Sequence, residues 1–266
     1  MSLKLLIIKN CAVITTLLVV FSKFSFAEDL SLVKTGTFTI AHDDSFAPFG
    51  FAEKNSQGKY NNSVGFEIDL LKKVAEKIGL KAEFQPNAWA KVLVSVKVGT
   101  ADAIATIGIN DERKKSYDYS EPYAKYAAIL FIPKDKGLSK LSELNGKKLG
   151  IQKNHFSVPW IRAQFPKIEQ VTFENAKDCF LATLSGKVEG AVADKLVGLY
   201  TINQNSELKG KLKFVGDEFA STPVALAFAK GQKVQLRKKF NEALNTFQKS
   251  NDSEQIFNKW FGTSDK

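Results

Sequence analysis

Several residue types are scarce in this 266-residue chain, and their scarcity excludes whole classes of site. The chain has two cysteines and two histidines, and it contains neither a glycine-rich nucleotide loop nor a nucleophile elbow. Cys11 lies in a segment that we expect to be removed, which leaves Cys179 alone and excludes an internal disulfide bond. With only His42 and His155, and with no cluster of metal-ligating residues, we expect no metal and no cofactor.

Long apolar runs are also scarce, and the main one lies near the N-terminus. Residues 1–27 contain lysines and no acidic residue, and an apolar stretch occupies 11–21. Ser25 and Ala27 supply small residues at the −3 and −1 positions of a cleavage site. The apolar stretch is too short to span a bilayer comfortably. We therefore predict a signal peptide over residues 1–27 and export of the remainder, with a retained N-terminal anchor as the alternative.

The overall composition is that of an ordinary soluble globular protein, with 44% hydrophobic and 25% charged residues. The length favours two lobes or one large domain. A formal net charge of +10 can indicate a nucleic-acid partner. Here the lysines are scattered, however, and Lys72 and Lys73 fall on the polar side of a predicted helix. We interpret them as a solvated surface and expect no nucleic-acid partner.

The most informative segment is residues 65–80, with the sequence GFEIDLLKKVAEKIGL. Its apolar residues first alternate and then, from Ile68, recur at the spacing of a helical face. Gly79 is suited to the left-handed conformation at which a helix ends. The pattern predicts a short extended segment, a helix of about three turns and a further strand at 80–84. By itself this is one β-to-α unit of an α/β protein.

Taken as a string, this segment resembles the signature of the family 3 solute-binding proteins, which bind amino acids for ABC importers. Further segments match that family in the same order: DDSFAPF at 43–49, TIGINDERKK at 106–115, YSEPY at 119–123, LSELNGKKLGI at 141–151, LSGKVEGAVAD at 184–194 and IFNKWFG at 256–262. The resemblance covers residues 36–262. It implies a two-lobed α/β fold, the type II periplasmic-binding-protein fold, with two Rossmann-like lobes joined by two crossover strands. Lobe 1 would comprise 28–126 and 224–266, and lobe 2 would comprise 127–223.

The loop after the predicted strand at 37–41 is the first candidate part of the ligand site, because ligands bind beyond the carboxyl ends of strands in open α/β sheets. In the family, an aromatic residue of this loop packs over the bound amino acid, and an acid often points into the pocket. Phe46 and Asp43 match these positions, and Trp89 matches a second aromatic position. Ordinary core packing is the alternative for Phe46.

Arg113 matches the arginine with which the family clamps the α-carboxylate of its ligand. A guanidinium fork suits this task because it donates two parallel hydrogen bonds. Thr106 supplies a hydroxyl, whereas Gly108 stands where a serine or threonine is frequent and offers only its backbone N–H. Without the family context, we would interpret Arg113 as a surface residue beside acids and lysines.

The resemblance implies two further contributions from lobe 2. Family members usually carry G-[ST]-[ST] in a turn that binds the carboxylate, and here the turn is Asn154, His155 and Phe156. Backbone donors can survive this change, but hydroxyl contacts cannot. Asp194 matches the acid that pairs with the ligand's α-ammonium, and a helix N-cap is its alternative role.

These resemblances imply a periplasmic binding protein, not an enzyme, that delivers a polar free amino acid to an inner-membrane ABC permease. We expect a cationic ligand (arginine, ornithine, lysine or histidine), because Asp43 could pair with a distal cation held between Phe46 and Trp89. Glutamine is the leading competitor, since family members that bind it also carry an acid at this position. The alternatives are a periplasmic cyclohexadienyl (arogenate or prephenate) dehydratase, with Asp194 or His155 as an acid, and a sensor partner of a membrane kinase. We expect a monomer.

Overall fold

The structure is a computed structural model that describes residues 30–261. The predicted signal peptide lies outside the described residues. Within residues 30–261, none of the helices has the length and apolar character needed to cross a membrane.

The described chain alternates strands with helices along most of its length. The strands are β1 Thr37–Asp43, β2 Ser45–Phe46, β3 Gly50–Lys54, β4 Tyr60–Val64, β5 Lys81–Asn87, β6 Ala103–Ile104, β7 Tyr117–Tyr119, β8 Ala124–Pro133, β9 Lys148–Gln152, β10 Glu169–Phe173, β11 Gly190–Asp194, β12 Leu212–Val224 and β13 Ala227–Ala229. The α-helices are α1 Phe66–Lys77, α2 Trp89–Ser95, α3 Asp111–Lys114, α4 Val158–Gln164, α5 Ala176–Leu184, α6 Lys195–Gln204, α7 Val234–Phe247 and α8 Asn251–Phe261, and a 3-10 helix, η1, spans Leu141–Leu144.

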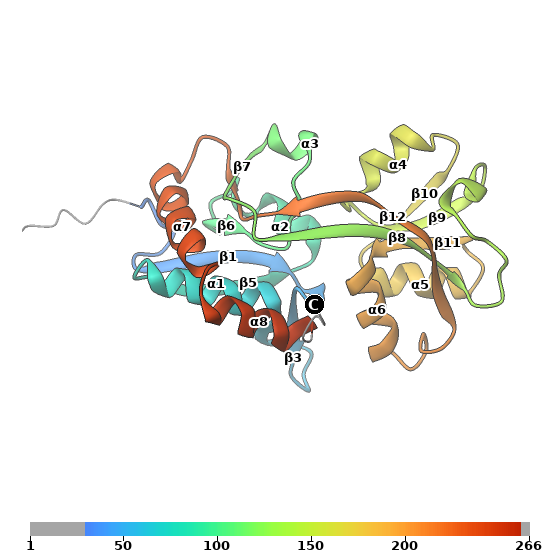
Figure 1. The fold of residues 1–266 in the computed structure, drawn as a ribbon, viewed down its shortest axis with the longest axis horizontal. Coiled ribbons are helices and arrows are strands. Elements are labelled where there is room, and N and C mark those ends of the chain that lie inside the picture. Colours follow the sequence, from blue (N-terminus) through green and yellow to red (C-terminus); the bar gives the residue numbers. More distant parts are fainter. Residues whose placement is uncertain (1–29, 262–266) are drawn as a thin grey trace, which may run out of the picture.

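Two separate sheets divide the molecule into two lobes (Figure 1). The strand order is β5-β1-β6-β13-β7 in the first lobe and β10-β9-β11-β8-β12 in the second, and β2, β3 and β4 form a small sheet beside the first. The long strands β8 and β12 pair antiparallel and run between the lobes (Figure 1). The two-lobed α/β fold with two crossover strands, expected from the sequence, is confirmed. The predicted lobe boundaries, 126/127 and 223/224, fall within these two strands.

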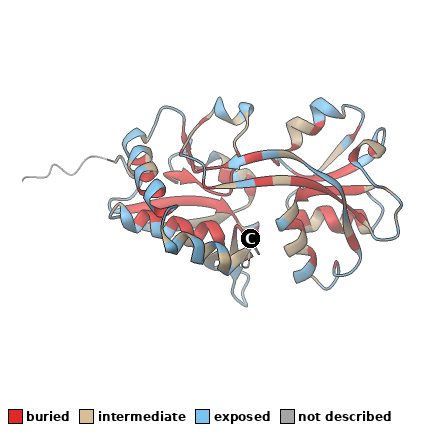
Figure 2. Cartoon of the chain, viewed as in Figure 1, coloured by how far each residue is buried: buried red, intermediate tan, exposed pale blue. Residues whose placement is uncertain are grey.

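Helix α1 forms where the sequence pattern predicts a helix. Its apolar stripe is completely buried at Ile68, Leu71 and Val74, while polar residues such as Lys72 remain exposed. The helix begins two residues before the stripe, at Phe66, and Gly79 follows its end with a φ of +75°. The same division between buried strands and helices with an exposed outer face extends over both lobes (Figure 2).

The apolar run at 101–107 has the continuous pattern of a strand buried on both faces, but the strand that forms there is much shorter. The run is buried throughout, but β6 contains only Ala103–Ile104. Strand pairing stops because Thr106 adopts a φ of +57°, which turns the backbone out of the extended conformation. This turn brings Thr106 against the end of the neighbouring parallel strand β1, where its hydroxyl accepts a hydrogen bond from the backbone N–H of Asp43 (3.1 Å).

Gly198 in α6 packs directly against the crossover strand β8. A Cβ atom at this position would lie 2.2 Å from Cζ of Phe131, whose ring is fully buried. We expect Gly198→Val to lower the free energy of unfolding by about 1–3 kcal/mol, because the ring has no space into which to move. Urea unfolding measures this change. Gly137→Val is the control, since a Cβ there meets nothing within 4 Å, and equal midpoints for the two variants would contradict the prediction.

Candidate functional site

Arg113 joins the two lobes through main-chain oxygen atoms. It lies on the short helix α3, where the side chain of Asn110 caps the helix by accepting from the backbone N–H of Arg113 (2.8 Å). The guanidinium donates to the carbonyl oxygen of Gly108 in its own lobe (2.8 Å) and to that of Asn154 in the other lobe (2.7 Å). Within residues 30–261 these contacts use two of its five N–H donors.

Trp89 and Asn154 complete this contact between the lobes. The guanidinium carbon of Arg113 lies 5.4 Å from the centre of the Trp89 ring, and the indole N–H of Trp89 also donates to the carbonyl of Asn154 (3.3 Å). Asn154 presents this carbonyl because it adopts a φ of +60°, a conformation that asparagine tolerates better than most residues. The cation that lies over Trp89 is therefore the protein's own Arg113.

Asp43 forms a second contact between the lobes. Its Oδ1 atom accepts from the backbone N–H and the hydroxyl of Ser45 (both 2.9 Å), and its Oδ2 atom accepts from Nε2 of Gln152, at the end of β9 (2.8 Å). Burial raises the pKa of Asp43 to about 6, although the hydrogen bonds from Ser45 and Gln152 oppose this shift. Sequence reasoning missed Gln152, although it is a polar residue at the end of an apolar strand, where ligands bind in open α/β sheets.

Thr106 and Gly108 line the same edge of the first sheet. The hydroxyl of Thr106 donates to the carbonyl of Ala105 (2.7 Å) while it accepts from Asp43, so its single proton is already committed. A Cβ on Gly108 would lie 2.6 Å from the Cγ2 methyl of Thr222 on β12. This explains why the chain carries glycine where the family frequently has serine or threonine: the crossover strand fills the space.

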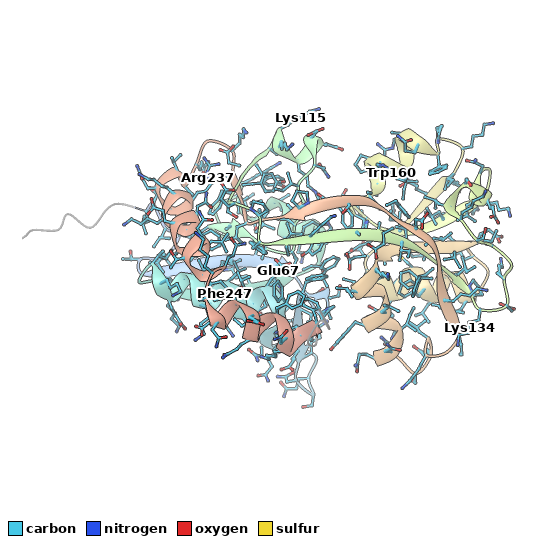
Figure 3. All side chains as sticks on the ribbon, viewed as in Figure 1. Glu67, Lys115, Lys134, Trp160, Arg237 and Phe247 are labelled. Atoms are coloured by element: carbon cyan, nitrogen blue, oxygen red, sulfur yellow. The ribbon has the colours of Figure 1, made fainter. Side chains whose placement is uncertain are left out.

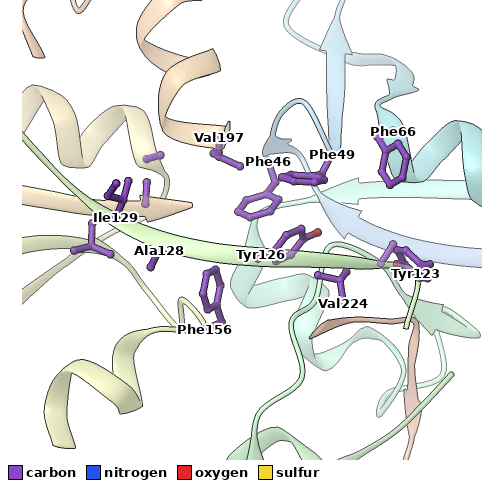
Figure 4. Close-up of a cluster of buried hydrophobic side chains, with 14 of the residues drawn as sticks. Phe46, Phe49, Phe66, Tyr123, Tyr126, Ala128, Ile129, Phe156, Val197 and Val224 are labelled. Atoms are coloured by element: carbon purple, nitrogen blue, oxygen red, sulfur yellow. The ribbon is translucent and has the colours of Figure 1, made fainter. Parts of the chain in front are cut away.

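Aromatic rings gather around β8 between the lobes (Figure 4). The ring of Tyr126 on β8 lies 5.0 Å from that of Phe46 and 6.0 Å from that of Phe156 in the second lobe, measured between centroids. Phe46 is only 6% exposed and also packs against Phe49, at 5.9 Å. It therefore has many core contacts, which was the alternative given for it. Tyr126, which sequence reasoning missed, connects the apolar residues of the two lobes.

Glu67 is a fully buried carboxylate at the start of α1 (Figure 3). It accepts hydrogen bonds from the hydroxyls of Tyr126 and Tyr123 (2.7 Å for Tyr123) and from the backbone N–H of Thr106 (2.9 Å). Burial raises its pKa, and these three donors oppose the shift. Glu67 thus ties α1 to β8 and to the turn that carries Thr106. Sequence reasoning found no signal for this role, because a glutamate is almost never fully buried unless it is paired.

His155 is buried and neutral. Its Nδ1 atom accepts from the backbone N–H of Ser157 (3.3 Å) and lies 2.8 Å from the Ser157 hydroxyl, so Nε2 carries the ring proton. Burial, together with the charge of Arg113, lowers the pKa of His155 to about 3. Nε2 has no hydrogen-bond partner among the described residues.

Asp194 ends β11 and caps α6. Its Oδ1 atom accepts from the backbone N–H groups of Leu196 (2.9 Å) and Val197 (3.2 Å), and Oδ2 accepts from that of Ala127 on β8 (3.0 Å). The capping role, given as its alternative, is therefore present. Burial raises the pKa of Asp194 to about 6, against the effect of these donors. Oδ2 retains a lone pair for a further donor, and the pairing of Asp194 with an ammonium stays a prediction.

Comparisons with known proteins agree on one family. A profile described as bacterial extracellular solute-binding proteins, family 3, matches residues 38–263. The L-cystine-binding protein TcyJ of Escherichia coli (strain K12) is 27% identical over 90% of this chain and 88% of its own length. The structure of an ancestral arginine-binding protein bound to arginine has a TM-score of 0.75 and 33% identity, over 85% of this chain and 99% of that one. ArtJ, an arginine-, lysine- and histidine-binding protein from Geobacillus stearothermophilus, has a TM-score of 0.75 and 29% identity, over 86% and 97%.

The role of Glu67 can be tested through stability. Glu67→Gln keeps the size of the side chain but replaces one acceptor oxygen with an NH₂ donor that faces the three donors now bound to the carboxylate. We expect the free energy of unfolding to fall by about 1–3 kcal/mol at pH 7. Urea unfolding measures it, with Glu76→Gln on the exposed face of the same helix as the control. The prediction is wrong if the two variants unfold at the same urea concentration.

Proposed function

Because this chain belongs to the bacterial extracellular solute-binding proteins of family 3, we propose that it is the periplasmic binding component of an amino-acid ABC importer. It captures a free polar amino acid between its lobes as a monomer, and an inner-membrane permease recognises the closed form. The observation that carries this proposal is the set of charged groups between the lobes. Arg113 has N–H donors that are not used within residues 30–261, and the buried carboxylates of Asp43 and Asp194 form no ion pair with those residues.

The charges of a free amino acid complement this set. A carboxylate and an ammonium are each costly to remove from water, so each needs a partner of opposite charge in a closed cleft. Arg113 in the first lobe binds the α-carboxylate, and Asp194 in the second lobe binds the α-ammonium. Since these partners come from opposite lobes, a ligand that carries both charges favours the closed form over the open form.

We further propose that the ligand's side chain carries a positive charge, because Asp43 is held in the cleft with a raised pKa and a nearby cation would stabilise its charged form. Asp43 reaches the cleft together with Gln152, and an amide side chain could also bind this pair, so glutamine stays the leading competitor. The expected sandwich of the side chain between Phe46 and Trp89 has less support, because the guanidinium of Arg113 lies over Trp89.

Ligand competition tests the proposed function directly. We expect the purified chain to bind arginine, ornithine, lysine or histidine more tightly than glutamine or glutamate, because only the cationic side chains can pair with Asp43. Competition calorimetry at pH 7.5 measures this order. Tighter binding of glutamine would contradict the cationic ligand but keep the importer role, whereas turnover of prephenate or arogenate would replace that role with an enzymatic one.

The clamp role of Arg113 predicts a large effect of its removal. We expect Arg113→Ala to weaken amino-acid binding by roughly 30- to several-thousand-fold, as truncation of one partner of a buried charge pair does. Calorimetry measures the affinity, and circular dichroism checks the fold. Lys115→Ala is the matched control, because this exposed lysine also carries a positive charge beside α3 and makes no ion pair among the described residues. Equal affinities for the two variants would refute the assignment.

The raised pKa values of the two acids predict how binding depends on pH. Both carboxylates are protonated below a pKa of about 6, and an ammonium or guanidinium binds only the charged form, so affinity must fall as the pH falls through 6. Between pH 7.5 and 5.0 we expect a loss of about tenfold for each carboxylate that pairs with a ligand cation.

A cationic amino acid should therefore lose about a hundredfold, through Asp43 and Asp194, and glutamine about tenfold, through Asp194 alone. Calorimetry at the two pH values measures both ligands. Asp43→Asn should reduce the loss of arginine affinity between the two pH values from about a hundredfold to about tenfold, and it should leave the loss of glutamine affinity unchanged. Equal profiles for the two ligands would show that Asp43 faces no ligand cation.

A further inference from the structure

An apolar groove with a volume of about 690 Å³ lies between the lobes, where α8 of the first lobe faces α6 of the second (Figure 1). Its lining in the first lobe comes from the loop between β2 and β3, the starts of α1 and β8, and α8. Leu196 and Tyr200 on α6 line it from the second lobe. Asp43, Arg113 and Asp194 do not line this groove, so it is separate from the proposed amino-acid site.

The lining is rich in aromatic rings, and part of its apolar surface faces solvent. The ring of Phe257 on α8 lies 6.3 Å from that of Phe66 and 5.0 Å from that of Phe261, measured between centroids. Phe257 is nevertheless 44% exposed, and Leu196, which lines the groove from the other lobe, is 42% exposed. Apolar patches of this kind on a protein surface mark sites of interaction.

Lys125, at the start of β8, is the single charged side chain in this lining. It is exposed and forms no ion pair with a carboxylate of residues 30–261, whereas Lys259 on α8 is paired with Asp69 (2.7 Å). An apolar groove with one cation complements a molecule that has an apolar body and one anionic group. The cationic amino acid proposed above has the opposite charge, so this groove requires a second class of ligand.

We propose that this groove binds a soluble monocarboxylic acid with an apolar body, of the size of a medium-chain fatty acid. Its volume lies within the range of small-molecule sites. The apolar body packs against the rings of α8 and against Leu196, and the carboxylate pairs with Lys125. Burial of the apolar body supplies most of the affinity, because an ion pair at an exposed lysine adds little.

The groove lies directly behind both halves of the proposed amino-acid site. Phe49, which lines it, belongs to the loop that follows Phe46, and the Phe49 ring lies 4.6 Å from that of Tyr126 (Figure 4). Leu196 belongs to the first turn of α6, and its backbone N–H donates to Oδ1 of Asp194 (2.9 Å). An acid in the groove contacts both lobes and stabilises their arrangement, so it favours amino-acid binding. This coupling rests on the proposed function, whereas the groove site does not.

Calorimetric titration with decanoate, below its micelle concentration and without any amino acid, tests the site. We expect saturable binding, with octanoate weaker by about tenfold because its shorter chain buries fewer methylene groups. Leu196→Gln and Phe257→Gln replace exposed apolar side chains of the lining, so each should weaken decanoate binding several-fold. Val234→Gln is the matched control, because Val234 is 53% exposed and lies outside the groove. Circular dichroism checks the fold of each variant.

Decanol tests the role of the charge, since it has the same chain without the anionic group. Lys125→Gln should weaken decanoate about two- to fivefold and leave decanol unchanged. Lys73→Gln, which removes an exposed positive charge from α1 outside the groove, should change neither affinity. The proposal is overturned if decanoate does not bind, if the Leu196 and Phe257 variants bind it as Val234→Gln does, or if Lys125→Gln changes both affinities by the same factor.

The affinity for arginine tests the coupling separately. In decanoate at a concentration that saturates the unmodified chain, we expect arginine to bind several-fold more tightly, and we expect this gain to be smaller in Leu196→Gln. Unchanged or weaker arginine binding would overturn the coupling. A chain that binds decanoate but no amino acid would instead overturn the proposed function and leave the groove site supported.

Discussion

The buried carboxylate of Glu67 is the constraint on which the geometry between the lobes depends. It holds Tyr123 and Tyr126 near the start of β8, and the backbone N–H of Thr106 at the turn that ends β6. An acid so deeply buried is costly unless several donors compensate for the loss of water. Because these donors come from a crossover strand and a site loop, the cost of burying Glu67 is offset only when helix, strand and loop are all in place. The carboxylate thus fixes the position of the Tyr126 ring, around which the aromatic residues of the two lobes meet.

Away from the crossover strands, polar side chains of residues 30–261 join the two lobes at two separate places. Gln152 donates to Asp43 at one, and the carbonyl of Asn154 accepts from Arg113 and Trp89 at the other. In each case the group that the family resemblance assigns to the ligand already bonds to the opposite lobe. The lobes therefore contact one another without a ligand. The free energy that a ligand contributes to closure is the difference between the interactions that it makes and those that it displaces. Asp43 illustrates this difference, because a cation would compete with the amide of Gln152 for its Oδ2 atom.

Charge is distributed unequally around the cleft. Burial raises the pKa values of Asp43 and Asp194, whereas Lys97, Arg113 and Arg162 line a groove formed by α2, α3 and α4, together with the acid Glu112. The net charge of the chain, +10, gives no hint of this separation, because most of its lysines lie on solvated surfaces where salt screens them. This separation of charge suits a ligand that carries both signs.

The sequence by itself determined where several of the helices and strands lie and that the fold is of the α/β class. The apolar stripe of α1 and the strand that precedes the Asp43 loop follow from local spacing and propensity, which need no partner from elsewhere in the chain. Helix capping by Asp194 was the alternative that its local sequence offered. Only the tertiary structure decided that β6 stops at Ile104, that Thr222 fills the space beside Gly108 and that Gln152 reaches Asp43. These features depend on atoms that are distant along the chain: 63 residues separate Asp43 from Thr106, and 109 separate Asp43 from Gln152. Contacts at such separations arise from the packing of whole elements, and no local pattern encodes them.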